Sequence, residues 1–103
     1  MAKTIRAKLL KMKGGAVLAM CDTELIGTVL KEGKIVLDLK KYAVFYGDES
    51  FAEDSTKLTE YITEATSVNA VGKTALSVLK KSGLDVSAAK KIGDTLHIQI
   101  YRL

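Results

Sequence analysis

The chain has 103 residues and a formal net charge of +4, from 16 Lys and Arg against 12 Asp and Glu. Hydrophobic residues make up 48% of it, which excludes an intrinsically disordered chain, because enough apolar surface is present to offset the entropy of ordering. The length excludes a second full domain, so we expect one domain over residues 1–103.

Two strands joined by a tight turn are predicted at the start of the chain. Ile5, Ala7 and Leu9 alternate with polar residues, and this period of two is typical of a half-buried strand. The continuous apolar run over residues 16–21 predicts a buried strand. A flexible turn at residues 13–15 joins the two strands into a hairpin.

A second hairpin and an irregular segment are predicted next. Asp22 is expected to cap a short turn over residues 23–25. Residues 28–31 and 34–39 flank a Glu-Gly pair, which predicts another hairpin. Residues 40–54 are expected to form a loop anchored by aromatic side chains.

Two helices are predicted in the second half of the chain. The first begins at Asp54 or Ser55 and is interrupted after residue 65, and Ser67 or Asn69 then caps the second. Gly83 suits the position just beyond the end of the second helix. The apolar positions of the two helices follow helical spacing: Leu58, Tyr61, Ile62 and Ala65, then Val71, Ala75, Val78 and Leu79.

The last segment is predicted to return to the sheet. Residues 87–91 are compatible with one turn of helix, and residues 93–94 turn the chain into a final strand over residues 95–103. The elements together predict an α+β fold: a mostly antiparallel sheet, with β-hairpins at the N-terminus and a C-terminal strand, and two helices packed on one face.

Charge is unevenly distributed along the chain. Residues 1–46 hold nine basic and four acidic residues, residues 47–65 one basic and six acidic, and residues 66–103 six basic and two acidic. An acidic middle with basic flanks predicts an electrostatically polarised surface.

The single cysteine, Cys21, excludes an intramolecular disulfide. No apolar run approaches the roughly 18 residues that cross a bilayer. Together with the absence of an export signal at the basic N-terminus, this predicts a cytoplasmic protein that does not contact a membrane.

One group of residues could carry nucleophilic catalysis, namely Cys21, Asp22, Asn69 and His97. A histidine can deprotonate a thiol while an amide orients the imidazole, provided that the side chains meet. The alternative is structural, because Cys21 shares a strand face with apolar residues and His97 alternates with them.

No metal site and no cofactor are expected. One Cys and one His cannot supply the four ligands of structural zinc. The acidic run Asp48, Glu49, Glu53 and Asp54 is more typical of a solvated loop than of a magnesium site. Gly72-Lys73-Thr74 resembles the end of a phosphate-binding loop, but Ser67 stands where that motif has its first glycine, and a helix rather than a strand is expected before it.

Basic residues near the first hairpin favour a binding surface. If the first and last strands were neighbours, Arg6 and Lys8 would share an open face with His97, Gln99 and Tyr101. The predicted nucleic-acid-binding residues are Arg6, Lys8, Lys11, Lys13 and Tyr101. With 14 Lys and two Arg, contacts would engage phosphates and shape rather than base sequence.

The chain resembles a small archaeal family of unknown function, domain of unknown function 424. The resemblance rests on residues 17–27 (VLAMCDTELIG), 32–34 (EGK), 45–47 (FYG) and 68–72 (VNAVG). Residues 93–97 depart from the family, which tends to carry a proline in that run. The resemblance implies an archaeal cytosolic protein and implies no activity.

Three functional hypotheses follow. The favoured one is a non-catalytic module that docks on RNA or a ribonucleoprotein, in translation or RNA processing, and that weakens when Lys8, Lys11 and Lys13 are changed together. The second is a small enzyme or enzyme subunit that uses the Cys21, Asp22, Asn69 and His97 group. The third is a protein–protein adaptor or a homodimer that pairs through an exposed sheet edge.

Overall fold

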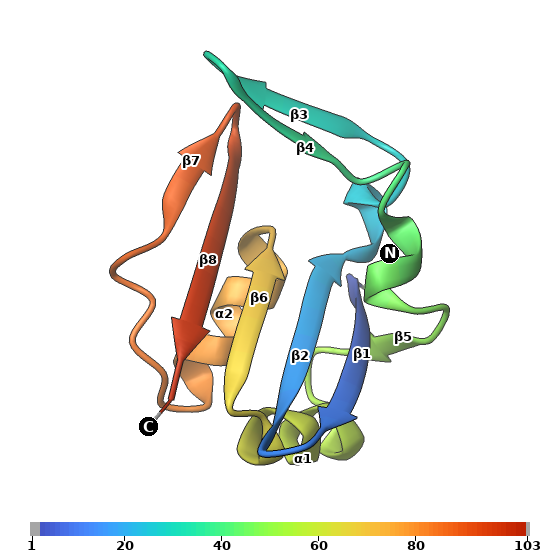
Figure 1. The fold of residues 1–103 in the computed structure, drawn as a ribbon, viewed down its shortest axis with the longest axis vertical. Helices are drawn as coiled ribbons and strands as arrows, with labels where there is room; N and C mark the ends of the chain where they lie inside the picture. Colours follow the sequence, from blue (N-terminus) through green and yellow to red (C-terminus); the bar gives the residue numbers. More distant parts are fainter. Residues whose placement is uncertain (1–2, 103) are drawn as a thin grey trace.

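A six-stranded sheet forms the centre of the computed structural model, which describes residues 3–102 (Figure 1). In order across the sheet, its strands are β5 (Ser50–Ala52), β1 (Thr4–Met12), β2 (Gly15–Asp22), β6 (Ser67–Val71), β8 (Thr95–Tyr101) and β7 (Lys90–Ile92). The other elements are the hairpin of β3 (Val29–Glu32) and β4 (Ile35–Asp38), the helices α1 (Thr56–Glu64) and α2 (Lys73–Lys81), and the 3-10 turns η1 (Thr23–Leu25) and η2 (Ala43–Tyr46).

The large sheet is mixed. β2 and β6 run parallel, with Leu18 opposite Val68, and every other pair of neighbouring strands is antiparallel. The parallel pair requires a long crossover, which here contains the β3–β4 hairpin, η2, β5 and α1. The predicted α+β class with a mostly antiparallel sheet and two helices is confirmed.

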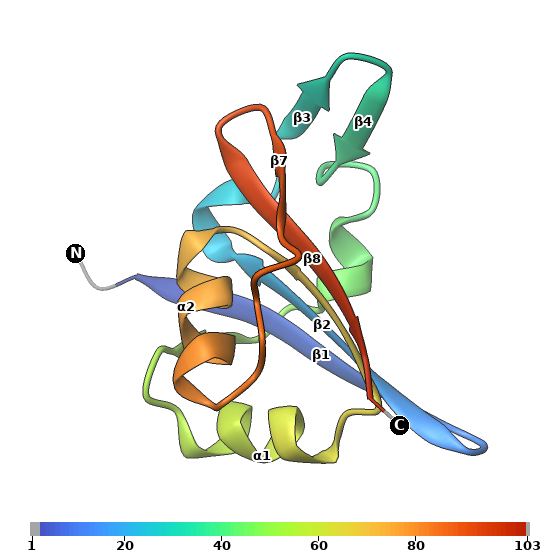
Figure 2. The same ribbon diagram turned by 90° about the vertical axis from the view of Figure 1, so that its left-hand side faces the viewer.

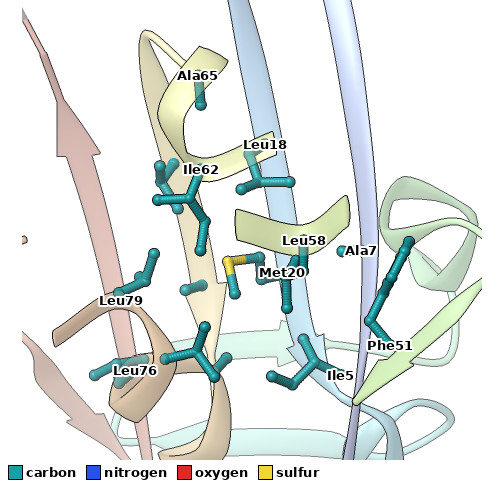
Figure 3. Close-up of a cluster of buried hydrophobic side chains, with 14 of the residues drawn as sticks. Ile5, Ala7, Leu18, Met20, Phe51, Leu58, Ile62, Ala65, Leu76 and Leu79 are labelled. Carbon is teal, nitrogen blue, oxygen red and sulfur yellow. The ribbon is translucent and has the colours of Figure 1, made fainter. Parts of the chain in front are cut away.

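The main core lies between the sheet and the helices. Met20 of β2 and Leu58 of α1 are fully buried in it, and so is Leu79 of α2 (Figure 3). Figure 2 shows α1 and α2 on the side of the sheet opposite the β3–β4 hairpin. One layer of apolar side chains from β1, β2, β6 and β8 therefore packs against both helices.

A second, smaller core lies on the other side of the sheet. Cys21 and Val71 project from adjacent strands and are fully buried beneath Leu39 and Tyr46. The β3–β4 hairpin and η2 supply the cover, so they close one end of this face and leave the remainder open.

Several local predictions are confirmed. β1 and β2 form the expected hairpin, and Gly93–Asp94 forms the turn into β8. Ser55 caps α1 by accepting a hydrogen bond from the backbone N–H of Leu58 at 3.2 Å. The strand predicted over residues 95–103 is observed over residues 95–101, and residue 103 lies outside the described part of the chain.

Two predictions for the chain after residue 65 are wrong. Residues 67–71 form the central strand β6 and do not separate two helices, so neither Ser67 nor Asn69 caps α2. The register pairs β6 with a strand on each side, and this tertiary pairing outweighs the weak local signal of a five-residue segment. Residues 87–91 form no helical turn, because Lys90 and Lys91 pair with β8 as part of β7.

Candidate functional site

Three rows of paired residues define the sheet face opposite the helices. Residues directly opposite in neighbouring strands point to the same side of a sheet. The first row is Arg6, Cys21, Val71, His97 and Lys90; the second is Lys8, Ala19, Asn69 and Gln99; the third is Leu10, Val17, Ser67 and Tyr101. Arg6, Lys8 and Tyr101 therefore share a face, whereas Lys11, which lies opposite Ala16, points to the other side. β1 and β8 are not neighbours, since β2 and β6 lie between them.

The thiol of Cys21 lies in the covered part of this face. Its side chain is 0% exposed, and Sγ donates to the backbone carbonyl of Asp22 at 3.4 Å. Burial, followed by the nearby charge of Asp22, raises the pKa of Cys21 to about 12. At neutral pH the thiol is protonated, so it is a poor nucleophile.

The four residues of the catalytic hypothesis do not converge. His97 is two strands away from Cys21, with Val71 between them, and Asn69 lies one row further along the face. The Asp22 carboxylate turns to the N-terminus of α2. Among the described residues, no hydrogen bond joins the side chains of any two of the four, so the structure gives this hypothesis no geometric support.

Asp22 has a structural partner that lies about fifty residues further along the chain. Its Oδ1 accepts from the N–H of Ala75 at 2.7 Å and its Oδ2 from the N–H of Thr74 at 3.1 Å. The expected cap on residues 23–25 is absent, because the carboxylate serves α2 instead of η1. Burial raises the pKa of Asp22, and the two backbone hydrogen bonds oppose that rise.

This capping contact also explains Gly72-Lys73-Thr74. A strand does precede this segment and a helix follows it, contrary to the helix expected before it. However, the Asp22 carboxylate takes the place where a phosphate would bind at the N-terminus of α2. Gly72 has φ +107°, and a Cβ there would lie 2.2 Å from Cγ of Asp22, so the position admits only glycine.

Two adjoining cavities occupy the open part of the face. The smaller, of about 230 Å³, is lined by Phe45 of η2 and by Asn69, Gln99 and Tyr101 of the sheet, among others. The larger, of about 610 Å³, shares Gln99 and Tyr101 with it and continues between the β3–β4 hairpin and β7. We call the two together the open-face groove; its further lining residues are Val17, Ile35, Val36, Leu37, Ser67, Val68, Ala88, Lys90, Lys91, Ile92, His97 and Ile98.

The groove combines amide, aromatic and basic side chains and has no acidic lining residue. Asn69 Oδ1 is buried and accepts no hydrogen bond from any described residue, which costs about 1–3 kcal/mol where the oxygen stays unsatisfied. Tyr101 is 76% exposed at the open end. Burial lowers the pKa of His97, so the imidazole is neutral at pH 7.

The basic residues predicted to bind nucleic acid make different contacts in the structure. The Arg6 guanidinium donates to the backbone carbonyl of Gly47 at 2.6 and 2.9 Å, so it holds the end of η2 in place. Lys11 pairs with Glu64 at 3.0 Å, near the end of α1. Lys8 is exposed on the open face, and Lys13 is exposed in the turn between β1 and β2.

Two lysines and one aromatic residue that line the groove were not predicted from the sequence. Lys90 and Lys91 lie in β7, which was not predicted as a strand. The two lysines precede a Gly-Asp turn and a clear strand, and this pattern is typical of a hairpin. Phe45 offered no such signal, because only the tertiary fold brings η2 beside β6 and β8.

No metal-ligand cluster and no membrane-spanning helix lie within residues 3–102. No cluster of three or more His, Cys, Asp or Glu side chains is placed to hold a metal ion in this part of the chain. The acidic side chain of Glu49 forms an ion pair with Lys57 at 3.3 Å. Neither described helix has the length and apolar character needed to span a membrane.

The fold and the groove thus define a small α+β domain with one covered and one partly open sheet face. The chain belongs to the family described as protein of unknown function (DUF424), which matches residues 11–103. A crystal structure of an uncharacterized conserved protein from Methanopyrus kandleri is similar, with a TM-score of 0.80 and 28% sequence identity over 97% of this chain and 92% of that chain. No curated protein matches the sequence.

Proposed function

We propose that this protein is a non-catalytic module of the archaeal cytoplasm that binds RNA, free or within a ribonucleoprotein, through the open-face groove. Translation and RNA processing are the processes in which we place it. The similarity to a chain from Methanopyrus kandleri supports an archaeal origin. A β-sheet surface with exposed aromatic and amide side chains is a common platform for RNA bases.

The observation that carries this proposal is the chemistry of the groove. Lys90 and Lys91 border the larger cavity, Phe45 and Tyr101 border the smaller one, and no carboxylate lines either. The acidic residues of the segment 47–65 belong to β5, α1 and their flanking loops, outside this lining. A polyanion is therefore attracted to the groove without meeting a like charge there.

The other two hypotheses have less support. A thiol with a pKa of about 12 does not suit catalysis near neutral pH. Edge pairing between two copies would use β5 or β7 of the large sheet, each only three residues long, or the four-residue strands β3 and β4 of the hairpin. β3 and β7 carry lysines. Short edge strands that carry lysine resist pairing with another sheet.

Fluorescence anisotropy with a labelled pool of random 12-nucleotide single-stranded RNA tests the proposal. The double variant Lys90→Gln and Lys91→Gln should weaken binding about tenfold at moderate salt, because the phosphate contact of Lys90 and the charge of Lys91 at the cavity edge are lost. The matched control is Lys80→Gln with Lys81→Gln at the end of α2, which changes net charge equally outside the groove. Equal affinities for the two double variants would contradict the proposal.

Affinity capture from the source cell, with and without nuclease, separates RNA from protein partners. RNA binding predicts that captured ribonucleoproteins disappear after nuclease treatment and that the Lys90 and Lys91 double variant captures less RNA. A partner that persists after nuclease and is insensitive to these lysines would identify the protein as an adaptor instead.

A further inference from the structure

The smaller cavity of the open-face groove contains a side chain with unused hydrogen-bonding capacity. Asn69 lies in the middle of β6, between Ala19 of β2 and Gln99 of β8. Its Oδ1 atom is buried and has no donor among the described residues. Most buried polar atoms of proteins have a partner, so an unpaired acceptor in a cavity wall indicates a ligand that donates to it.

The surroundings of this amide suit a flat aromatic ring. The cavity is lined by the aromatic residues Phe45 and Tyr101, the latter largely exposed. The other residues that line it beside Asn69 are Val17, Ser67, Val68 and Gln99. The cavity volume is about 230 Å³, so it admits one small group and not a folded segment. Aromatic side chains stack on nucleobases of any identity, because every base has a π-face.

We propose that this cavity receives one unpaired base of the bound RNA, with Asn69 accepting a hydrogen bond from the Watson–Crick edge of that base. The inference rests on the proposed function and specifies its substrate class, which is single-stranded RNA. An amide presents an acceptor beside a donor, and the Watson–Crick edge of each base offers a donor beside an acceptor. In a duplex this edge is already used, and the narrow major groove of A-form RNA keeps side chains out.

The positions of the lysines beside the groove are compatible with a base turned into the smaller cavity. Lys90 and Lys91 lie along the larger cavity, which meets the smaller one at Gln99 and Tyr101. A strand whose phosphates follow the lysines can therefore turn one base inward to Asn69. Lysines alone would bind duplex and single strand alike, so the amide and the rings supply the discrimination.

Three RNA ligands of one length test the inference on the wild-type protein by anisotropy. They are a labelled 12-nucleotide single strand, the same strand annealed to its complement, and a 12-nucleotide backbone of abasic residues. We expect the single strand to bind about tenfold more tightly than either of the others, because stacking and the amide contact are lost in both.

The variant Asn69→Ala should lower single-strand affinity about threefold, because one hydrogen bond to the base is lost while stacking remains, and it should leave the affinity for the abasic backbone unchanged. Its melting temperature should not fall, because the amide oxygen makes no hydrogen bond within the fold. Ser77→Ala on α2 is the control, since it removes a polar side chain outside the groove and should change no affinity.

Each outcome decides one question. Binding of all three ligands with equal affinity, unchanged in Asn69→Ala, would overturn the base pocket and leave an RNA-binding module that recognises phosphates. Failure of the wild-type protein to bind any of the three would overturn the proposed function, and the base pocket with it.

Discussion

No local sequence pattern predicts the contact between Asp22 and Gly72. The carboxylate of Asp22 satisfies two backbone N–H groups in the first turn of α2, as an N-cap side chain normally does from within its own segment. Here the capping group comes from the end of β2, and Gly72 leaves the space that it occupies. The contact ties the central sheet to a helix of the main core.

Replacement of Gly72 by alanine should lower the free energy of unfolding by about 2 kcal/mol or more, because a Cβ adds a collision with Asp22 to an unfavourable backbone conformation. Gly14→Ala is the matched control. Gly14 also has positive φ but has open space around it, so its loss should be about 1 kcal/mol. Urea denaturation of the two variants measures the difference, and equal losses would exclude the collision with Asp22.

His97 makes stability depend on pH. Burial lowers its pKa below the usual 6.5, so the folded state holds the proton less tightly than the unfolded chain does. Its contribution to stability is complete above pH 6.5 and is lost as pH falls from 6.5 through the lowered pKa of the folded state.

The variant His97→Gln should therefore lose less stability than the wild-type protein between pH 7.5 and pH 5. Urea midpoints at the two pH values measure this, and the NMR titration of the chain's single histidine reports the pKa directly. Parallel changes in both proteins, or a histidine that titrates at or above 6.5, would contradict the assignment.

At the scale of elements, the β3–β4 hairpin stands apart from the large sheet. It belongs to a sheet of its own and reaches the β7–β8 turn, where Glu32 Oε1 accepts from the N–H of Gly93 at 3.1 Å. Val36 and Ile35 of its second strand are more than half exposed. Few buried contacts predict a low free energy of local opening.

Glu32→Ala should accelerate hydrogen exchange at Gly93 and throughout β3 and β4, because it removes the acceptor that joins the hairpin to β7 and β8. Global stability should change by less than about 1 kcal/mol, as expected for an exposed hydrogen bond. Glu32→Gln keeps an oxygen acceptor and should exchange like the wild-type protein. Unchanged exchange in Glu32→Ala would show that the hairpin is held by other contacts.

The sequence predicts those elements whose pattern is local. Alternation in residues 5–9 and the spacing from Leu58 to Ala65 indicate β1 and α1 because each pattern records which side faces the core. β6 was not predicted as a strand because five residues of mixed polarity give too short a hydrophobic pattern. The groove was not predicted either, because its walls come from segments that meet only after folding. Asn69 was singled out, but as a possible helix cap and as a catalytic candidate.

At the scale of the whole molecule, charge is distributed by face. Lys8 and Lys90 lie on the open side of the sheet, whereas Lys11 pairs with Glu64 at the end of α1. The triple change of Lys8, Lys11 and Lys13 therefore removes charges from different regions. The open face, and not the whole basic flank of the sequence, is the surface that we expect to attract RNA.

Two phosphate contacts on the open face, by Lys8 and Lys90, predict a slope of about −1.4 for the logarithm of RNA affinity against the logarithm of salt concentration. The Lys90→Gln and Lys91→Gln double variant should reduce this slope to about −0.7, and Lys11→Gln should leave it unchanged. Anisotropy titrations between 50 and 200 mM salt, a range in which such contacts are resolved, measure the three slopes. A slope near zero in the wild-type protein would rule out binding by phosphate contacts.

The parallel pairing of β2 with β6 has a consequence for how the chain acquires its fold. β6 needs a partner on both sides, and one of them, β8, is the last strand of the sheet to be synthesised. The hairpin of β1 and β2 can form early, but joining the two halves of the sheet must wait for both the long crossover and β8. A nascent chain arrested before residue 95 would therefore expose the unpaired side of β6, and its sensitivity to protease should fall sharply once β8 is complete.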